Sequence, residues 1–216
     1  MLVVIAGGHG KIALLLTELL DERGDRVRSL IRNPDHRDDV TEAGAEPVLC
    51  DLENEGVDRI AEAIGGADAV VFAAGACPGS GAGRKDSMDY EGAAKLMDAA
   101  AEDGIDRYVM VSAISADAAH EGEEVWDVYV RAKGRADDRL AASGLDHTIV
   151  RPGRLSDQPA TGLVSATPPG QGEYGEIPRA DVAAVIAAVL DERSTVGKTF
   201  DVVSGETPIE RAVSSL

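Results

Sequence analysis

A tyrosine and a lysine stand four residues apart in a stretch of helical periodicity, Tyr129-Val130-Arg131-Ala132-Lys133. Residues with this spacing share one helix face, so the phenol and the ammonium point in the same direction. The ammonium favours the phenolate, and such a tyrosine could give a proton to a carbonyl oxygen or take it back. We predict that Tyr129 is a general acid/base with Lys133 as its electrostatic partner. The alternative is a partly buried tyrosine beside a surface lysine.

Two further residues extend this candidate site. Ser112 ends a predicted strand and is expected to hydrogen-bond the substrate oxygen, whereas Ser115 already lies in the following loop. Trp126 precedes Tyr129 by three residues and therefore lies near the same helix face. It could line a substrate pocket or serve packing alone.

A glycine-rich turn follows the first apolar run and opens the first predicted helix, Gly7-Gly8-His9-Gly10-Lys11-Ile12-Ala13. Glycine at the first position permits a tight turn, and Gly10 lets a pyrophosphate approach the backbone at the helix N-terminus. We predict dinucleotide binding by Gly7, Gly8, His9, Gly10, Lys11 and Ile12, against the alternative of an ordinary strand–helix turn. Within the turn, His9 could contact a phosphate or point at solvent.

The end of the second predicted strand indicates which dinucleotide binds. Arg32 and Asn33 stand there, and a guanidinium can form two hydrogen bonds to a 2′-phosphate. The sequence therefore predicts NADP, with NAD kept as the alternative because Asp35 and Asp38 are close. The other expected cofactor contacts are Asp51 and Leu52 beside the adenine, the Ala73-Ala74-Gly75 backbone, Lys133 on the nicotinamide ribose, and Arg151 and Pro152.

Short β-branched runs alternate with helical stretches along the chain, a pattern typical of a parallel sheet flanked by helices. Strands are expected at Leu2–Ala6, Arg26–Ile31, Glu46–Cys50, Ala69–Ala73, Tyr108–Ser112, His147–Val150 and Thr199–Val203. Helices are expected at Lys11–Arg23, Pro34–Ala43, Val57–Ile64, Asp86–Asp103, Trp126–Ala142 and Arg179–Glu192. We predict a single α/β domain over residues 1–216, a Rossmann fold whose doubly wound parallel sheet has about seven strands. Segments 113–128 and 152–178, the second read as a long loop, are expected to form the substrate pocket.

The amino-acid composition limits the kinds of molecule that this protein is expected to bind. The chain has 216 residues and a net charge of −18, which disfavours nucleic acid and anionic membranes. Such acidity suits a salt-loving organism or a GC-rich genome. Two distant cysteines and no histidine pair with ligand spacing predict no metal. No targeting sequence or membrane-length apolar run is evident, so we expect a cytoplasmic protein with a small-molecule substrate, as a monomer or homodimer.

Several motifs carry a family resemblance. The chain resembles the atypical, NmrA-like branch of the short-chain dehydrogenase/reductase superfamily. The matching motifs are Gly7-x-x-Gly10-x-x-Ala13, Ile31-Arg32-Asn33-Pro34, Cys50-Asp51-Leu52, Phe72-Ala73-Ala74-Gly75, Val111-Ser112-Ala113 and Ile149-Val150-Arg151-Pro152-Gly153. In Asp89-Tyr90-Glu91-Gly92, Asp89 stands where extended members carry asparagine, which implies a supporting catalytic role. The stretch from Ser143 to Gly162 is also similar to the flavin/biliverdin reductase, which has a histidine where this chain has Arg154.

The resemblance implies a Rossmann fold, NADP, and hydride transfer to or from a carbonyl, quinone or flavin-like acceptor. Two other functions remain open. One is a sugar epimerase or dehydratase, in which bound cofactor is reduced and reoxidised each cycle. The other is a redox sensor that binds NADP without turnover.

Overall fold

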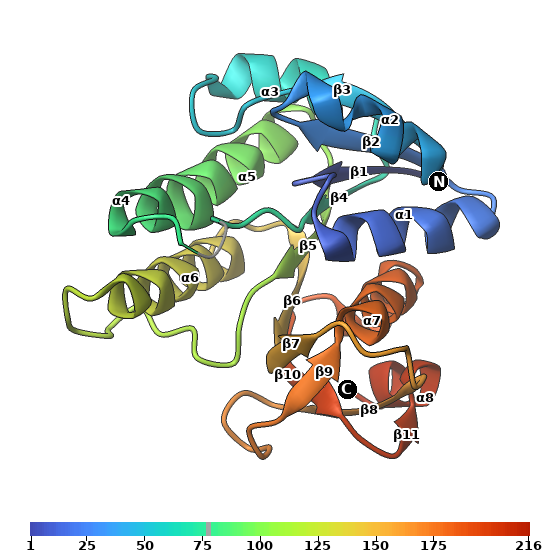
Figure 1. The fold of residues 1–216 in the computed structure, drawn as a ribbon, viewed down its shortest axis with the longest axis vertical. Coiled ribbons are helices and arrows are strands. Elements are labelled where there is room, and N and C mark those ends of the chain that lie inside the picture. Colours follow the sequence, from blue (N-terminus) through green and yellow to red (C-terminus); the bar gives the residue numbers. More distant parts are fainter. Residues whose placement is uncertain (77–78) are drawn as a thin grey trace.

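A nine-stranded sheet forms the middle layer of the computed structural model, which describes residues 1–76 and 79–216 (Figure 1). The strand order is β11-β8-β10-β6-β5-β4-β1-β2-β3, and only β8 runs antiparallel to the other strands. The strands are β1 (Leu2–Ala6), β2 (Arg26–Ile31), β3 (Ala45–Leu49), β4 (Ala69–Phe72), β5 (Arg107–Val111), β6 (Asp146–Pro152), β8 (Leu163–Thr167), β10 (Lys198–Ser204) and β11 (Thr207–Pro208). This confirms the predicted α/β Rossmann architecture.

Helices cover both faces of the sheet (Figure 1). The helices α1, α7 and α8 pack against one another on one face, and α3, α5 and α6 do so on the other. The described helices are α1 (Lys11–Glu22), α2 (Arg37–Glu42), α3 (Val57–Ile64), α4 (Ala82–Arg84), α5 (Ala93–Glu102), α6 (Val125–Ala141), α7 (Arg179–Asp191) and α8 (Ile209–Ser214). Short 3₁₀ turns lie at η1 (Pro34–His36) and η3 (Arg193–Thr195), and a π-helix at η2 (Lys85–Gly92).

The central strands are apolar because helices bury both of their faces. Every residue of β1 and β4 is buried, and β5 is buried except at its first residue, which is partly buried. Phe72, Tyr108 and Phe200 are the largest fully buried side chains, and small aliphatic residues fill the space around them. A core with few aromatics therefore forms on each face of the sheet.

The segment between β6 and α7 differs from the predicted long loop. It contains β8, which joins the main sheet antiparallel to β10, and a two-stranded sheet of β7 (Arg154–Ser156) and β9 (Glu176–Pro178). These strands have three to five residues and are interrupted by glycine and proline, so their periodicity is too short to recognise in the sequence. The helix α8 was likewise not predicted.

The predicted cofactor residues gather because parallel strands end at one edge. Gly7 follows β1, Arg32 follows β2, Ala73 follows β4 and Ser112 follows β5. The chain order reverses between β1 and β4, and in open α/β sheets the ligand crevice lies outside the strands at such a point.

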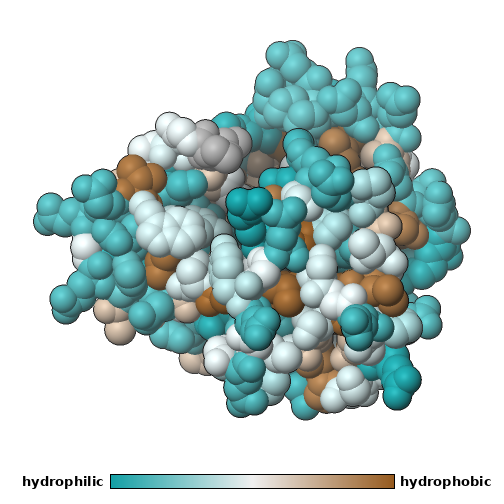
Figure 2. Space-filling model, turned by 60° about the horizontal axis from the view of Figure 1, so that its bottom comes forward, coloured by the Kyte–Doolittle hydropathy of each residue, from teal (hydrophilic) through white to brown (hydrophobic). Residues whose placement is uncertain are grey.

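The surface agrees with the acidic composition. Figure 2 shows a face on which hydrophilic residues surround small, separated hydrophobic areas. Within residues 1–76 and 79–216, no helix is long and apolar enough to cross a membrane.

Candidate active site

The first two glycines of the turn, Gly7 and Gly8, have no room for a side chain. Gly7 has φ +79°, and a Cβ there would lie 2.6 Å from the Ala74 Cα. A Cβ on Gly8 would lie 2.4 Å from the Ser29 Cβ, and the Gly8 N–H donates to the Leu30 carbonyl at 3.0 Å. No side chain caps the start of α1, so its first N–H groups are open to an anion. The turn therefore fits a dinucleotide pyrophosphate.

Replacing Gly7 with alanine is expected to disturb the turn in two ways. The positive φ and the clash with Ala74 should destabilise the fold by about 1–3 kcal/mol. Moving the turn should weaken NADPH binding by about tenfold or more, equivalent to ~1.4 kcal/mol. Gly66→Ala is the matched control, because Gly66 has φ +73° but open space around it. Nucleotide fluorescence titration and thermal melting measure both effects; equal NADPH affinity in the two variants would contradict the assignment.

Arg32 lies at the end of β2 as predicted, but it has an unforeseen partner. Its Nη1 lies 3.1 Å from the Glu53 Oε2, and Arg84 Nη2 lies 2.7 Å from the same oxygen. Ser87 also donates a hydrogen bond to Glu53. These partners hold the pKa of Glu53 below its usual range, and the hydrogen bond from Arg84 has the largest effect. Arg32 remains about half exposed, at 53% of its side chain, so its other donors are available to a ligand.

The other predicted residues of this region make local contacts. Asn33 caps η1 by accepting from the Asp35 N–H, and Asp51 accepts from the Glu53 N–H. Leu52 is buried among apolar side chains. The Asn33 and Asp51 side chains are thus each engaged in a local hydrogen bond.

Two side chains of the glycine turn reach away from it. His9 Nε2 lies 2.7 Å from the Asp39 Oδ2, and its ring stacks on His36 with centroids 3.6 Å apart. Lys11 pairs with Asp157 at 2.5 Å, and Arg179 pairs with the other oxygen of that carboxylate at 2.6 Å. Lys11 therefore ties the turn to the segment after β6.

A buried ion pair lies at the predicted catalytic position. Lys133 Nζ is 3.3 Å from the Asp89 Oδ1 and donates to the Val111 carbonyl at 3.1 Å, and the two side chains are 5% and 1% exposed. Burial pulls the pKa of Lys133 down, but its interactions with Asp89, Tyr129 and Asp137 together outweigh burial, so the net pKa is raised. The lysine is held cationic next to Tyr129.

Tyr129 stays a phenol. Burial raises its pKa, the Lys133 charge lowers it by less, and Asp89 raises it again. The lysine favours the phenolate, as expected, but the burial of the ring has the larger effect. Within the described residues its hydroxyl has no hydrogen-bond partner, and the Trp126 ring centroid lies 5.5 Å from its ring. Tyr129 therefore keeps its proton, and its hydroxyl is open to a ligand.

Ser112 is brought to the site, but its hydroxyl points to another partner. It donates to the Asp137 Oδ2 at 2.9 Å, and Arg151 Nε lies 2.7 Å from the same oxygen. Burial raises the pKa of Asp137, while Arg151 and Ser112 lower it in part. A serine has one proton to donate, so in this arrangement Ser112 can accept from a ligand but not donate to it. Arg151 takes part in this network through its Nε.

Sequence reasoning missed Asp137 and Lys85. Asp137 continues the four-residue spacing from Tyr129 and Lys133 along α6, which was a usable signal. Lys85 lies four residues before Asp89 in the π-helix η2, and both are buried. Both side chains bind the backbone of Ala76, in the segment after β4. Lys85 donates to the Ala76 carbonyl, and Asp89 accepts from the Ala76 N–H at 3.2 Å. π-Helical turns frequently occur at functional sites.

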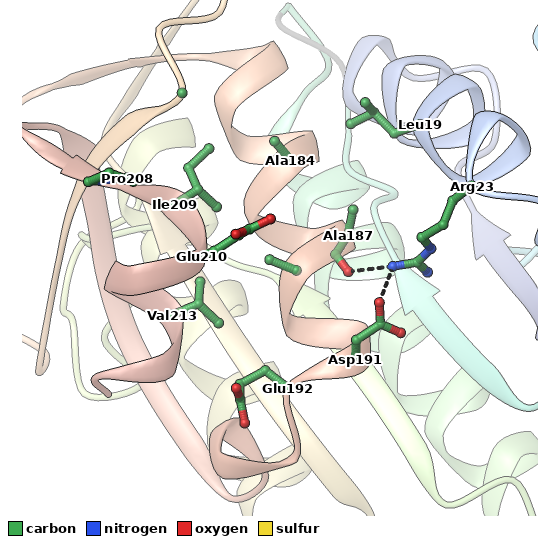
Figure 3. Close-up of a pocket in the computed structure, with 12 residues that line it drawn as sticks. Leu19, Arg23, Ala184, Ala187, Asp191, Glu192, Pro208, Ile209, Glu210 and Val213 are labelled. Carbon is green, nitrogen blue, oxygen red and sulfur yellow. Dashed lines mark hydrogen bonds and ion pairs between the residues drawn. The ribbon is translucent and has the colours of Figure 1, made fainter.

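A separate hollow of about 640 Å³ lies between α1, α7 and α8 (Figure 3). Leu19, Ala184, Ala187 and Val213 line it, and Arg23 closes one end by binding Asp191 and the Ala187 carbonyl. It is next to the C-terminal ends of α1 and α7, so it lies toward the edge opposite the glycine turn. The described residues contain no group of three His, Cys, Asp or Glu that could hold a metal.

Comparison with known proteins agrees with this geometry. The sequence pattern of the NAD(P)H-binding family matches residues 7–193. This chain belongs to that family. It is an atypical short-chain dehydrogenase/reductase of the NmrA-like type, as the sequence motifs predicted.

Three similar proteins cover essentially the whole chain. The "Uncharacterized sugar epimerase YhfK" of Bacillus subtilis is 40% identical over 100% of both chains. The structure of an NAD-dependent epimerase/dehydratase candidate from Bacillus halodurans is 39% identical, with a TM-score of 0.92 over 100% of both chains. The oxidoreductase ylbE of Lactococcus lactis is 26% identical, with a TM-score of 0.87 over 100% of this chain and 96% of its own.

Proposed function

We propose that this protein transfers hydride between NADP(H) and a carbonyl, quinone or flavin-like acceptor. The observation that carries this proposal is the buried Lys133–Asp89 pair beside the phenolic Tyr129, at the sheet edge that bears the glycine turn. The turn fits the cofactor because Gly7 and Gly8 leave no space for a Cβ. When bound, the nicotinamide supplies or accepts the hydride.

Each residue has a defined part in this proposal. Tyr129 donates a proton to the acceptor oxygen, Lys133 keeps a positive charge beside it and holds the ribose, and Asp89 positions Lys133. Arg32 selects NADP through the 2′-phosphate. Segments 113–128 and 152–178 enclose the acceptor.

The test is consumption of NADPH and NADH by the purified protein with a panel of quinones, flavins, aldehydes and ketones. We expect turnover with at least one class and a preference for NADPH that falls in Arg32→Ala. No consumption with any acceptor, despite tight NADPH binding, would contradict the proposal and favour a sensor.

An epimerase or dehydratase is the second candidate. The observation in its favour is that two proteins about 40% identical over their full length carry such names. Such an enzyme regenerates its cofactor in each cycle, so it would change a sugar nucleotide without net NADPH consumption.

The raised pKa of Tyr129 predicts the pH dependence. The phenol is the proton donor for reduction and is populated below its pKa, so the reductive kcat should show no loss from this group until about pH 10 or above. Oxidation needs the phenolate, so its rate should rise about tenfold per pH unit below that pKa. Rate profiles in both directions measure this. A reductive rate that falls through neutral pH as Tyr129 ionises would contradict it.

A further inference from the structure

Lys85 is a buried cation that the proposed reaction does not yet use. Its side chain comes from the π-helix η2, and the residue is 8% exposed. Its Nζ lies 5.3 Å from the centroid of the Tyr129 ring. Within the described residues its one hydrogen bond is to the Ala76 carbonyl.

Lys95 is a useful comparison, because all three protons of its ammonium group are hydrogen-bonded. Its Nζ donates to three carbonyls, those of Leu52, Glu53 and Glu55, at 2.9, 2.8 and 3.1 Å. All three of its protons are therefore used, although it is more exposed than Lys85. Toward the part of the chain that the structure describes, Lys85 uses one of its three protons, and burying unsatisfied charged donors is costly. A hydrogen bond to the Ala76 carbonyl does not by itself explain why a charged lysine is buried at position 85.

The charges around Tyr129 do not cancel. Lys85 and Lys133 supply two positive charges and Asp89 one negative charge, while Asp137 is paired with Arg151. A net positive charge next to the proton donor is unusual in a chain whose net charge is −18. A partly exposed phenol with an unpaired buried ammonium beside its ring is a site for an anionic ligand.

We propose that Lys85 binds an anionic oxygen of the substrate, so that the hydride acceptor is a carbonyl compound bearing a carboxylate or a comparable anionic group. This assignment rests on the proposed function in one respect, the statement that the anionic ligand is the hydride acceptor. Tyr129 donates its proton to the carbonyl oxygen, and Lys85 orients the anionic group next to it. Lys85 thereby selects anionic over neutral acceptors.

Trp126 makes binding observable without turnover. It is the chain's one tryptophan, is 57% exposed, and its ring lies 5.5 Å from that of Tyr129. Benzoate and benzamide are the probes, because they share ring and size but differ by one charge. Titrated against the protein with saturating NADP⁺, benzoate should quench Trp126 fluorescence at about tenfold or more lower concentration than benzamide.

Three variants test the role of Lys85. Lys85→Gln keeps a donor for the Ala76 carbonyl but removes the charge, and should abolish the preference for benzoate with little change in NADPH affinity. Lys85→Met should do the same at lower thermal stability. Lys95→Met is the matched control, expected to lose stability but keep the preference.

Several results would overturn the assignment. One is an equal affinity of the wild-type protein for both probes, and another is an unchanged preference in Lys85→Gln. A large loss of NADPH affinity in that variant would assign Lys85 to the cofactor instead. The outcome is separable from that of the proposed function: a Lys85-dependent benzoate preference without any NADPH consumption would retain the anion site and reject the oxidoreductase.

Discussion

Replacing Tyr129 with phenylalanine is expected to lower NADPH-dependent carbonyl reduction by about 10²–10⁴-fold, the usual contribution of a positioned general acid. The ring and its packing remain, so NADPH affinity and thermal stability should change little. The loss should fall on kcat, because the hydroxyl acts in proton transfer. Steady-state kinetics with an aldehyde or ketone acceptor measure it.

Tyr90→Phe is the control for loss of a hydroxyl. The Tyr90 ring lies 3.7 Å from the guanidinium carbon of Arg135 and belongs to the same π-helix as Asp89, yet it has no part in the proposed chemistry. The rate of carbonyl reduction by Tyr90→Phe should match that of the wild type. If Tyr129→Phe also kept a rate within a few-fold, hydride transfer would depend on ring alignment alone, as in reduction of a flavin or quinone, and the acid role would be wrong.

Replacing Lys133 with methionine is expected to have the largest effect on stability. It leaves the Asp89 carboxylate, 1% exposed, without its cation, and breaking a buried pair in this way costs about 3–5 kcal/mol. Because the pKa of Lys133 is raised, the pair contributes fully at neutral pH and is lost only as pH rises through that pKa. Chemical denaturation at neutral pH measures the loss, and reductase activity should disappear with it.

The double variant Lys133→Met/Asp89→Asn separates structure from chemistry. An asparagine oxygen can still accept from the Ala76 N–H, so removing both charges should recover most of the stability. Activity should stay absent, because the Lys133 ammonium no longer lies beside Tyr129. Recovered activity in the double variant would show that Lys133 is not needed for the reaction.

The order of elements and the glycine turn could be predicted because they depend on local pattern. β1 and β2 begin and end at the predicted residues, and α3 does too. Apolar runs buried on both faces, with glycine at the turns, specify such elements without reference to distant residues. The ends of those strands then placed Gly7, Arg32 and Ser112 on one edge.

Side-chain partners could not be predicted in the same way. The Ser112–Asp137 bond and the Arg32–Glu53 pair join residues on different elements, so they depend on packing distances that periodicity does not contain. The π-helix changes the register that places Lys85 beside Tyr129, and helical spacing alone does not show it. The net pKa of Tyr129 could not be predicted for the same reason, since burial is a tertiary property.

The most direct test of hydride transfer uses NADPH carrying deuterium on the transferring carbon of the nicotinamide ring, one stereoisomer at a time. The reduced acceptor is then analysed by mass spectrometry. We expect deuterium in the product from one stereoisomer and not from the other, and far less labelled product in the same time from Tyr129→Phe or Lys133→Met than from the wild type. Unlabelled product from both stereoisomers, or NADPH that is bound but never consumed, would contradict the account.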